Sequence, residues 1–226
     1  MLDYDSTWLF DMFAGVYAWF TAQSAWRASC ALLAEYLPTS ARDRLLVVDL
    51  GCGPGVSTFE MARQRPDALY IGLDRSNQML EEARRRQVRA GNSGPRSIRW
   101  VRADAAALPF ASATIDVLTG HSFLYLLGKN NRSPALREMV RVLRSDGRVV
   151  LMEPHAGPFS LRQVLQRNAG VRHLIAIALW RPFSRLHVRY TPGSLGSTLQ
   201  DFGMVSTQTQ EVLGGLGIIA CARKAA

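Results

Sequence analysis

The sequence predicts a doubly wound α/β fold, in which helices cover both faces of a mostly parallel sheet. Three observations lead to this prediction. From residue 45 to residue 152, short apolar runs of strand length alternate with longer runs of helical period. A glycine-rich turn separates the first strand of this alternation from its first helix. The C-terminal part differs, because two strand-like runs joined by a Gly-rich turn are typical of an antiparallel hairpin at a sheet edge.

The individual elements follow in chain order. Aromatic and apolar residues recur at helical spacing before residue 37, which predicts two helices that end at Pro38. Ser76 can cap one later helix, and Pro134 suits the first position of another. The alternation predicts strands at 45–50, 69–73, 98–103, 115–119 and 148–152, and helices at 56–65, 76–89 and 133–143. The hairpin strands are expected at 205–212 and 217–222.

The composition is basic. The formal net charge is +9, and nearly all of the positive charge is arginine, since Lys129 and Lys224 are the only lysines. This balance suits nucleic acid, an anionic membrane or an acidic ligand, and it equally suits a solvated arginine-rich surface. Cys30, Cys52 and Cys221 are too widely spaced for a metal pattern or a disulfide framework. We therefore expect no metal ion and a reduced, cytoplasmic compartment.

The clearest functional signal is the turn after the first predicted strand. Its alternate glycines let the backbone turn sharply and approach a ligand closely, and the next helix offers free N–H groups. A dinucleotide site would have its third glycine where Val56 stands. Asp49 stands two residues before the first of these glycines. Its carboxylate suits the ammonium of an amino-acid-like ligand, directly or through water, better than it suits a pyrophosphate. We therefore interpret the loop as a binding site for a cationic cofactor with a methionine moiety and not as a plain tight turn. The expected contacts with this cofactor are Asp49, Gly51, Cys52, Gly53 and Gly55.

Two further acidic residues follow the next two strands. Asp74 ends the second strand and can accept hydrogen bonds from both hydroxyls of a ribose, unless it only caps the helix that follows. Asp104 follows the third strand and can accept from an adenine amino group while the Ala105 N–H addresses a ring nitrogen, unless it only begins a short helix. The expected cofactor contacts also include Arg75 and Met79.

With these motifs, the chain resembles the class I S-adenosylmethionine-dependent methyltransferases, in the group that includes the quinone methyltransferases. The resemblance extends over residues 47–154. It rests on the glycine loop, the acidic end of 71–74, Asp104 with 108–110, the strand at 115–118 and the helix and turn at 141–148. The family commonly has Pro-Gly-Gly in that last turn, where this chain has Ser-Asp-Gly. The resemblance implies S-adenosylmethionine as the cofactor.

The resemblance also implies the architecture. We expect a Rossmann-like, doubly wound sheet of seven strands in the order 3-2-1-4-5-7-6, with the last hairpin antiparallel and an N-terminal helical lid. A chain of 226 residues is long enough for one well-cored domain and short for two. We therefore expect a single methyltransferase domain over 1–226. Its parts would be a lid at 1–40, a cofactor-binding core at 41–156, an acceptor-side insertion at 157–200 and the hairpin at 201–226.

The acceptor side is less specific. Methyl transfer from a sulfonium needs an aligned nucleophile and the exclusion of water, and it needs a base only if the acceptor loses a proton. Such folds bind ligands beyond the carboxyl ends of the strands. His121 is therefore the candidate base, and it could also contact the cofactor or the acceptor. Tyr125 is the second candidate catalytic residue and could contact the acceptor. The other candidate acceptor contacts are Tyr17, Glu153 and His155, and each of these side chains is also open to a structural role.

The segment 161–190 interleaves apolar runs with arginines. This pattern suits an interfacial helix on anionic lipid, and it also suits a packed helix with a charged outer face. In the lipid case Arg181, Arg185 and Arg189 would bind the phosphate of the acceptor. Nucleic acid is a less favoured partner because no appended basic module is visible, and no obligate protein partner is evident.

The sequence therefore predicts an enzyme that methylates a hydrophobic small molecule or a lipid at a membrane surface. A quinone or phenol and a phospholipid amine are both open as acceptors. A soluble metabolite and RNA are the alternatives within the same chemistry. A nicotinamide-binding oxidoreductase and a non-catalytic binding protein are the alternatives outside it. We expect a cytoplasmic protein, peripheral on the inner face of the membrane if the acceptor is a lipid.

Overall fold

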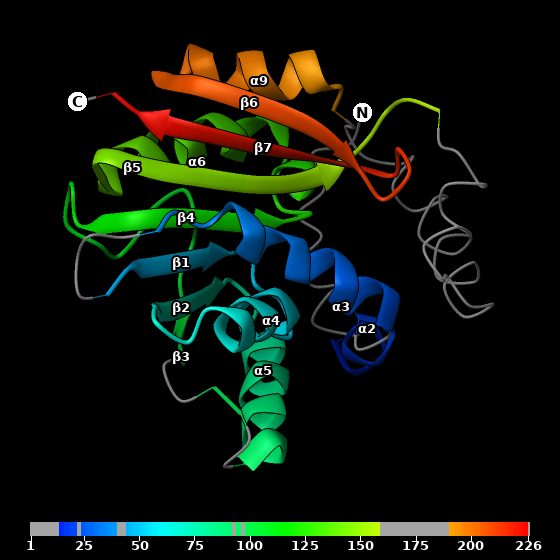
Figure 1. Ribbon diagram of the computed structural model, residues 1–226. Coiled ribbons are helices and arrows are strands. Elements are labelled where there is room, and N and C mark those ends of the chain that lie inside the picture. The colour runs from blue at the N-terminus through cyan, green and yellow to red at the C-terminus, as the bar shows by residue number, and fades with distance from the viewer. Residues whose placement is uncertain are drawn as a thin grey trace.

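The computed structural model describes residues 14–21, 24–39, 44–91, 94–95, 98–158 and 190–225. A seven-stranded sheet forms its centre, in the order β3-β2-β1-β4-β5-β7-β6 (Figure 1). Neighbouring strands pair in parallel from β3 to β5, and β7 pairs antiparallel with both β5 and β6. The strands are β1 Leu46–Leu50, β2 Leu69–Asp74, β3 Ile98–Arg102, β4 Ile115–His121, β5 Leu143–Pro154, β6 Met204–Val212 and β7 Gly217–Lys224. The predicted order and the antiparallel hairpin are confirmed.

Helices lie on both faces of this sheet. They are α2 Ala14–Thr21, α3 Ser24–Ala31, η1 Leu32–Tyr36, α4 Val56–Gln64, α5 Asn77–Ala90, η3 Leu124–Leu126, α6 Lys129–Val142 and α9 Pro192–Asp201. Side chains of β1 alternate between the two cores, as the two-residue period of a strand requires. Val48 and Leu50 pack with α6 and α9 on one face, whereas Val47 packs with α4 and η1 on the other. Among the described helices, none is long and apolar enough to cross a membrane.

Two helices differ from the sequence expectation. Helix α6 begins at Lys129 rather than at residue 133, because the N–H groups of Asn131 and Arg132 already bond to the Gly128 carbonyl. Pro134 therefore lies inside the helix and not at its first position. Helix α9 was not predicted, although Thr191 and Ser194 form a capping box around a proline at the helix start. The sequence therefore carries a local signal for the start of α9.

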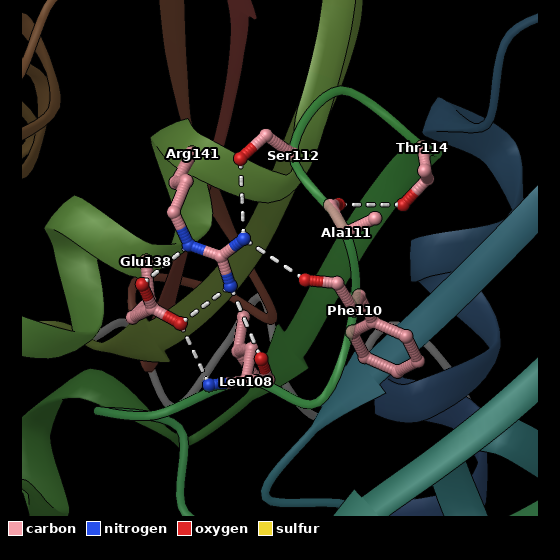
Figure 2. A network of polar contacts seen from close by, with 7 residues as sticks. All are labelled: Leu108, Phe110, Ala111, Ser112, Thr114, Glu138 and Arg141. Atoms are coloured by element: carbon pink, nitrogen blue, oxygen red, sulfur yellow. Dashed lines mark hydrogen bonds and ion pairs between the residues drawn. The ribbon is translucent and has the colours of Figure 1, made fainter.

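The loop between β3 and β4 is held by two side chains of α6. Arg141 donates from Nη1 to the Phe110 carbonyl at 2.9 Å and from Nη2 to the Leu108 carbonyl at 3.1 Å. Glu138 accepts from the Leu108 N–H at 2.7 Å and pairs with Arg141, as Figure 2 shows. The carboxyl-terminal half of this loop is thereby fixed to the helix, while its first residues, Asp104 and Ala105, follow the end of β3.

A buried carboxylate fixes the chain as it leaves β4. Glu153, near the end of β5, is 1% exposed. Its Oε1 accepts from the N–H groups of Phe123 and Leu124 at 3.1 and 2.7 Å, and its Oε2 accepts from the Tyr125 N–H at 3.2 Å. Burial raises the pKa of Glu153 to about 7, although these three bonds oppose the shift. The turn that follows His121 is therefore built on a carboxyl group that titrates near neutral pH.

This geometry predicts a pH-dependent contribution of Glu153 to stability. The folded state binds more protons than the unfolded state between the ordinary pKa of 4.5 and about 7. The contribution is complete below pH 4.5 and is lost as the pH rises through 7. We expect the free energy of unfolding, relative to that of Glu153→Gln, to fall by about 3 kcal/mol over this window in urea titrations.

The matched control is Glu81→Gln, which changes an exposed carboxylate on α5. This variant should keep the pH dependence of the original protein. Parallel pH profiles for the original protein and Glu153→Gln would contradict the raised pKa.

Candidate functional site

A cavity of about 350 Å³ opens at the carboxyl ends of β1 to β4. Parallel strands end at the same edge of a sheet, so the residues that follow each of them meet there. The cavity is lined by one residue of α2, by the glycine loop, and by the ends of β2, β3 and β4 with the start of α6. These residues are Tyr17, Gly51, Gly53, Leu73, Asp74, Arg75, Ser76, Met79, Ala103, Asp104, Ala105, His121, Ser122, Phe123, Leu126, Leu127, Gly128, Asn130 and Asn131.

The glycine loop is wound as the sequence predicts. Gly51, Gly53 and Gly55 all have positive φ, at 62°, 53° and 76°. A Cβ at Gly51 would lie 2.7 Å from the Phe123 ring, and one at Gly55 would lie 2.5 Å from the Trp100 ring. Both conformation and space therefore require glycine here. Gly51 and Gly53 face the cavity, whereas Gly55 caps the start of α4 beneath the indole.

Asp74 binds the glycine loop and the next helix at once. Its Oδ2 accepts from the Gly53 N–H at 2.8 Å, and its Oδ1 accepts from the Ser76 N–H at 2.9 Å. Ser76 in turn caps α5 by accepting from the Met79 N–H at 3.1 Å. The two roles that the sequence left open for Asp74 are thus compatible, because the residue supports both backbones and still lines the cavity.

Asp104 and Ala105 line the cavity just after the end of β3. The Asp104 Oδ1 accepts from the Ala106 N–H at 2.9 Å, and its Oδ2 lies 3.7 Å from Nε of Arg75. Both side chains of this pair are more than 40% exposed, so the pair contributes little to stability. Its place at the rim brings Arg75 to the same wall as Asp104.

Asp49 lies behind the cavity wall, so of the two contacts that the sequence left open, direct or through water, the direct one has no support here. It is 0% exposed and lies outside the set of residues that line the cavity. Its Oδ2 accepts from the hydroxyls of Ser57 and Thr58, both at 2.6 Å, and its Oδ1 accepts from Thr119 at 3.0 Å. Burial raises the pKa of Asp49 while these hydrogen bonds lower it. The carboxylate supports the loop from below instead of facing a ligand.

Cys52 also points away from the cavity. Its side chain is buried at 4% exposure, and burial raises the pKa of the thiol. The loop therefore contributes two glycines to the cavity wall, and Cys52 contributes packing beneath it.

His121 stands where β4 ends and where the N-terminal helices approach. Its Nε2 lies 3.0 Å from Oγ of Ser29, and its ring centroid lies 4.9 Å from that of Trp26. Burial lowers the pKa of His121 to about 4, and its own backbone partly opposes the shift. The imidazole is therefore neutral at neutral pH, and the burial that keeps it neutral also opposes its taking up a proton.

The N-terminal helices are bound to the core near this point. Arg27 of α3 pairs with the buried Glu60 of α4 at 2.5 Å. Tyr17 of α2 lines the cavity and packs edge-on against Trp26, with ring centroids 6.3 Å apart. Burial raises the pKa of Tyr17 well above its usual range. Tyr17 thus lines the cavity, and its contact with an acceptor stays a prediction.

The remaining predicted acceptor contacts are less well placed. Tyr125 is 4% exposed, and neither it nor Glu153 lines the cavity. The His155 Nδ1 lies 3.0 Å from the Gly215 carbonyl and its Nε2 lies 3.6 Å from Glu211, so this ring joins β5 to the hairpin. The structural alternatives therefore describe Glu153 and His155 better. Arg181, Arg185 and Arg189 lie outside the described residues.

Sequence reasoning missed much of the wall beyond β4. Ser122, Phe123, Leu126 and Leu127 line the cavity, and so do residues at the start of α6. Their position after a strand end was a usable signal. By contrast, the contact between Ser29 and His121 joins residues 92 positions apart and carries no local pattern.

Comparisons with known proteins agree with this geometry. Residues 47–147 match the family model described as a methyltransferase domain. A trans-aconitate 2-methyltransferase of Methylobacterium radiotolerans is 43% identical over 79 residues, which are 35% of this chain and 30% of that protein. A ubiquinone/menaquinone biosynthesis C-methyltransferase of Desulfotalea psychrophila is 39% identical over 108 residues, which are 47% and 40%. The chain spans less than half the length of these curated relatives.

A solved structure extends the likeness beyond the matched residues. The phosphoethanolamine N-methyltransferase 2 of Haemonchus contortus, in complex with phosphomonomethylethanolamine and S-adenosylhomocysteine, superposes with a TM-score of 0.68. The superposition covers 98% of this chain and 59% of the Haemonchus chain, with 13% sequence identity. At this identity the likeness shows the fold alone. The family match, the glycine loop and the strand order agree. Residues 47–147 therefore match a methyltransferase domain, and the sheet that holds them has the strand order that the resemblance implies.

Proposed function

We propose that this chain transfers a methyl group from S-adenosylmethionine to a hydrophobic small molecule or lipid. One observation carries the proposal: a single cavity brings together the glycine loop, Asp74 and Asp104, which the sequence singles out for three parts of one cofactor. The methionine part would lie along Gly51 and Gly53. Asp74 would accept from the ribose hydroxyls, and Asp104 with the Ala105 N–H would bind the adenine.

The cofactor supplies an electrophilic methyl group on a sulfonium. The protein aligns the acceptor with this methyl group and excludes water from the site. Tyr17 and Phe123 place aromatic rings on the cavity wall, and Trp26 packs behind them on His121. These rings exclude water from the acceptor side, which strengthens the electrostatic interactions there. His121 is neutral and near the acceptor side, so it can take a proton from a phenolic hydroxyl.

A quinone or phenol is the acceptor class that this wall favours. A neutral base beside aromatic rings fits a flat, apolar ring with one acidic hydroxyl, and one relative is named as a quinone C-methyltransferase. A phospholipid amine is the second candidate, and the solved N-methyltransferase with a phosphorylated amine supports it. A soluble acid is the third, since another relative is named for trans-aconitate.

A hydrophobic acceptor would be reached at an anionic membrane surface. Helix α2 contains no charged residue, and Trp19 on it is 69% exposed. The basic sequence with net charge +9 suits anionic lipid. In this proposal the arginines at 181, 185 and 189 bind lipid phosphate.

The cofactor proposal predicts tight selectivity. Calorimetry should show binding of S-adenosylhomocysteine and none of NAD. Asp74→Ala should weaken the binding by about 1.5–3 kcal/mol, which is about 10- to 150-fold, because a charge-assisted pair of hydrogen bonds is lost. Asp67→Ala is the control, since this exposed carboxylate stands before β2, at the opposite end of the strand from Asp74. Equal affinities in the folded Asp74→Ala variant and the original protein would exclude Asp74 from the site.

The acceptor chemistry predicts a specific effect of His121. The acceptor is first identified by incubating the protein with S-adenosylmethionine labelled in its methyl group and a lipid extract, followed by mass spectrometry. Turnover of that acceptor by His121→Ala should then fall by about 10²-fold or more, while S-adenosylhomocysteine binds as before. A loss below about threefold would remove His121 as the base.

Membrane docking predicts sedimentation with anionic vesicles and not with neutral ones. Each arginine near the surface contributes about 1 kcal/mol, and salt should weaken the attraction. Replacing Arg181, Arg185 and Arg189 with Gln should abolish sedimentation. The matched control replaces three exposed arginines of α5, Arg84, Arg85 and Arg89, and should keep it. Protein that stays in the supernatant at low salt would contradict docking and favour a soluble acceptor.

A further inference from the structure

One edge of the His121 ring faces the N-terminal helices. Its Nε2 lies 3.0 Å from Oγ of Ser29, a residue of α3 that is 4% exposed. The other ring nitrogen, Nδ1, is buried and has no hydrogen-bond partner among the described residues. Because the ring is neutral at neutral pH, one of the two nitrogens carries a hydrogen and the other a lone pair.

The hydroxyl of Ser29 decides which nitrogen carries the hydrogen. A serine hydroxyl has one hydrogen to donate and two lone pairs to accept with. The Ser29 Oγ lies 2.7 Å from the carbonyl oxygen of Trp26, one turn earlier in the same helix. A carbonyl oxygen only accepts, and this bond back to the preceding turn is common for serine in helices. The single hydrogen therefore goes to Trp26, and Oγ offers a lone pair to His121.

The opposite arrangement makes fewer bonds. If Ser29 donated to Nε2, its bond to the Trp26 carbonyl would be lost. The neutral ring would then carry its hydrogen on Nδ1, which makes no hydrogen bond of good geometry to the described residues. Both arrangements leave one unpaired group at Nδ1, so the hydrogen bond from Ser29 to the Trp26 carbonyl makes the difference between them. The Nε2–H form makes both bonds of Ser29 and leaves only a lone pair at Nδ1.

We propose that Ser29 is a positioning residue that holds His121 in the Nε2–H tautomer, so that Nδ1 is its basic atom. The tautomer itself follows from the contacts of α3 and β4. Its use in catalysis rests on the proposed function, because Nδ1 takes a proton only if the acceptor must lose one.

This assignment makes α3 part of the chemistry. None of the α3 side chains that the structure describes lines the cavity, yet this helix sets which atom of His121 is basic. Arg27 on the same helix pairs with Glu60 of α4, and this ion pair holds α3 against α4. Ser29 therefore reaches His121 from a helix that is bound to α4.

The test is nitrogen NMR of the protein labelled with ¹⁵N-histidine at neutral pH. A ring nitrogen that bears hydrogen and one that bears a lone pair have clearly different shifts, so the tautomer is read directly. The signals of His121 are assigned by their absence in His121→Asn. We expect a protonated Nε2 and an unprotonated Nδ1 in the original protein, with or without S-adenosylhomocysteine.

Variants of Ser29 then test its role. Ser29→Ala should move a measurable fraction of His121 to the Nδ1–H form, and Ser29→Thr, which keeps the hydroxyl, should retain the original spectrum. The matched control is Thr21→Ala, which removes another buried lid hydroxyl that bonds to earlier carbonyls of its own helix. It should leave the His121 signals unchanged.

An Nδ1–H or doubly protonated His121 in the original protein would overturn the proposal, and this spectrum is sufficient even if Ser29→Ala does not fold. A folded Ser29→Ala variant with the original spectrum would overturn it as well. The spectra need no acceptor and no turnover. An Nε2–H spectrum in a protein that transfers no methyl group would therefore refute the proposed function while supporting the tautomer.

Discussion

A buried carboxylate, Asp49, joins the three elements on which the candidate site depends. It sits near the end of β1 and accepts hydrogen bonds from two hydroxyls in the first turn of α4 and one on β4. The strand, the helix and the neighbouring strand are thereby fixed at the point where the glycine loop passes between them. Glu153 does the same for the chain after β4, through three backbone N–H groups. Polar groups buried beneath the cavity thus define the shape of its wall.

The sequence predicted the parts of the site that depend on local conformation. The alternate glycines adopt the positive φ that a sharp turn between strand and helix needs. Ser76 caps α5, as its position before an amphipathic run implies. The strand order came from family resemblance, because nothing local to 204–224 says that β7 inserts between β5 and β6. Helix α6 begins before its expected start because the Gly128 carbonyl already accepts from the first turn.

The sequence could not assign roles that depend on burial. Asp49 has the same residue type and motif position whether it faces a ligand or three hydroxyls, and only the packing of Ser57, Thr58 and Thr119 distinguishes these cases. The same holds for Glu153, which looks like a strand-end ligand in the sequence and serves as an acceptor for the backbone. Long-range partners such as Ser29 and His121 leave no periodic trace, so they were not predicted.

The indole of Trp100 has a consequence for how this domain can change. The ring lies where a Cβ would stand at Gly55 and at Gly72, and its Nε1 donates to Gln87 at 2.6 Å. A larger residue at Gly72 collides with the indole, whereas the same residue beside a small side chain at position 100 would have room. The effects of substitutions at these two positions are therefore non-additive. An evolving sequence must shrink residue 100 before it can enlarge residue 72, so the order of mutational steps is constrained.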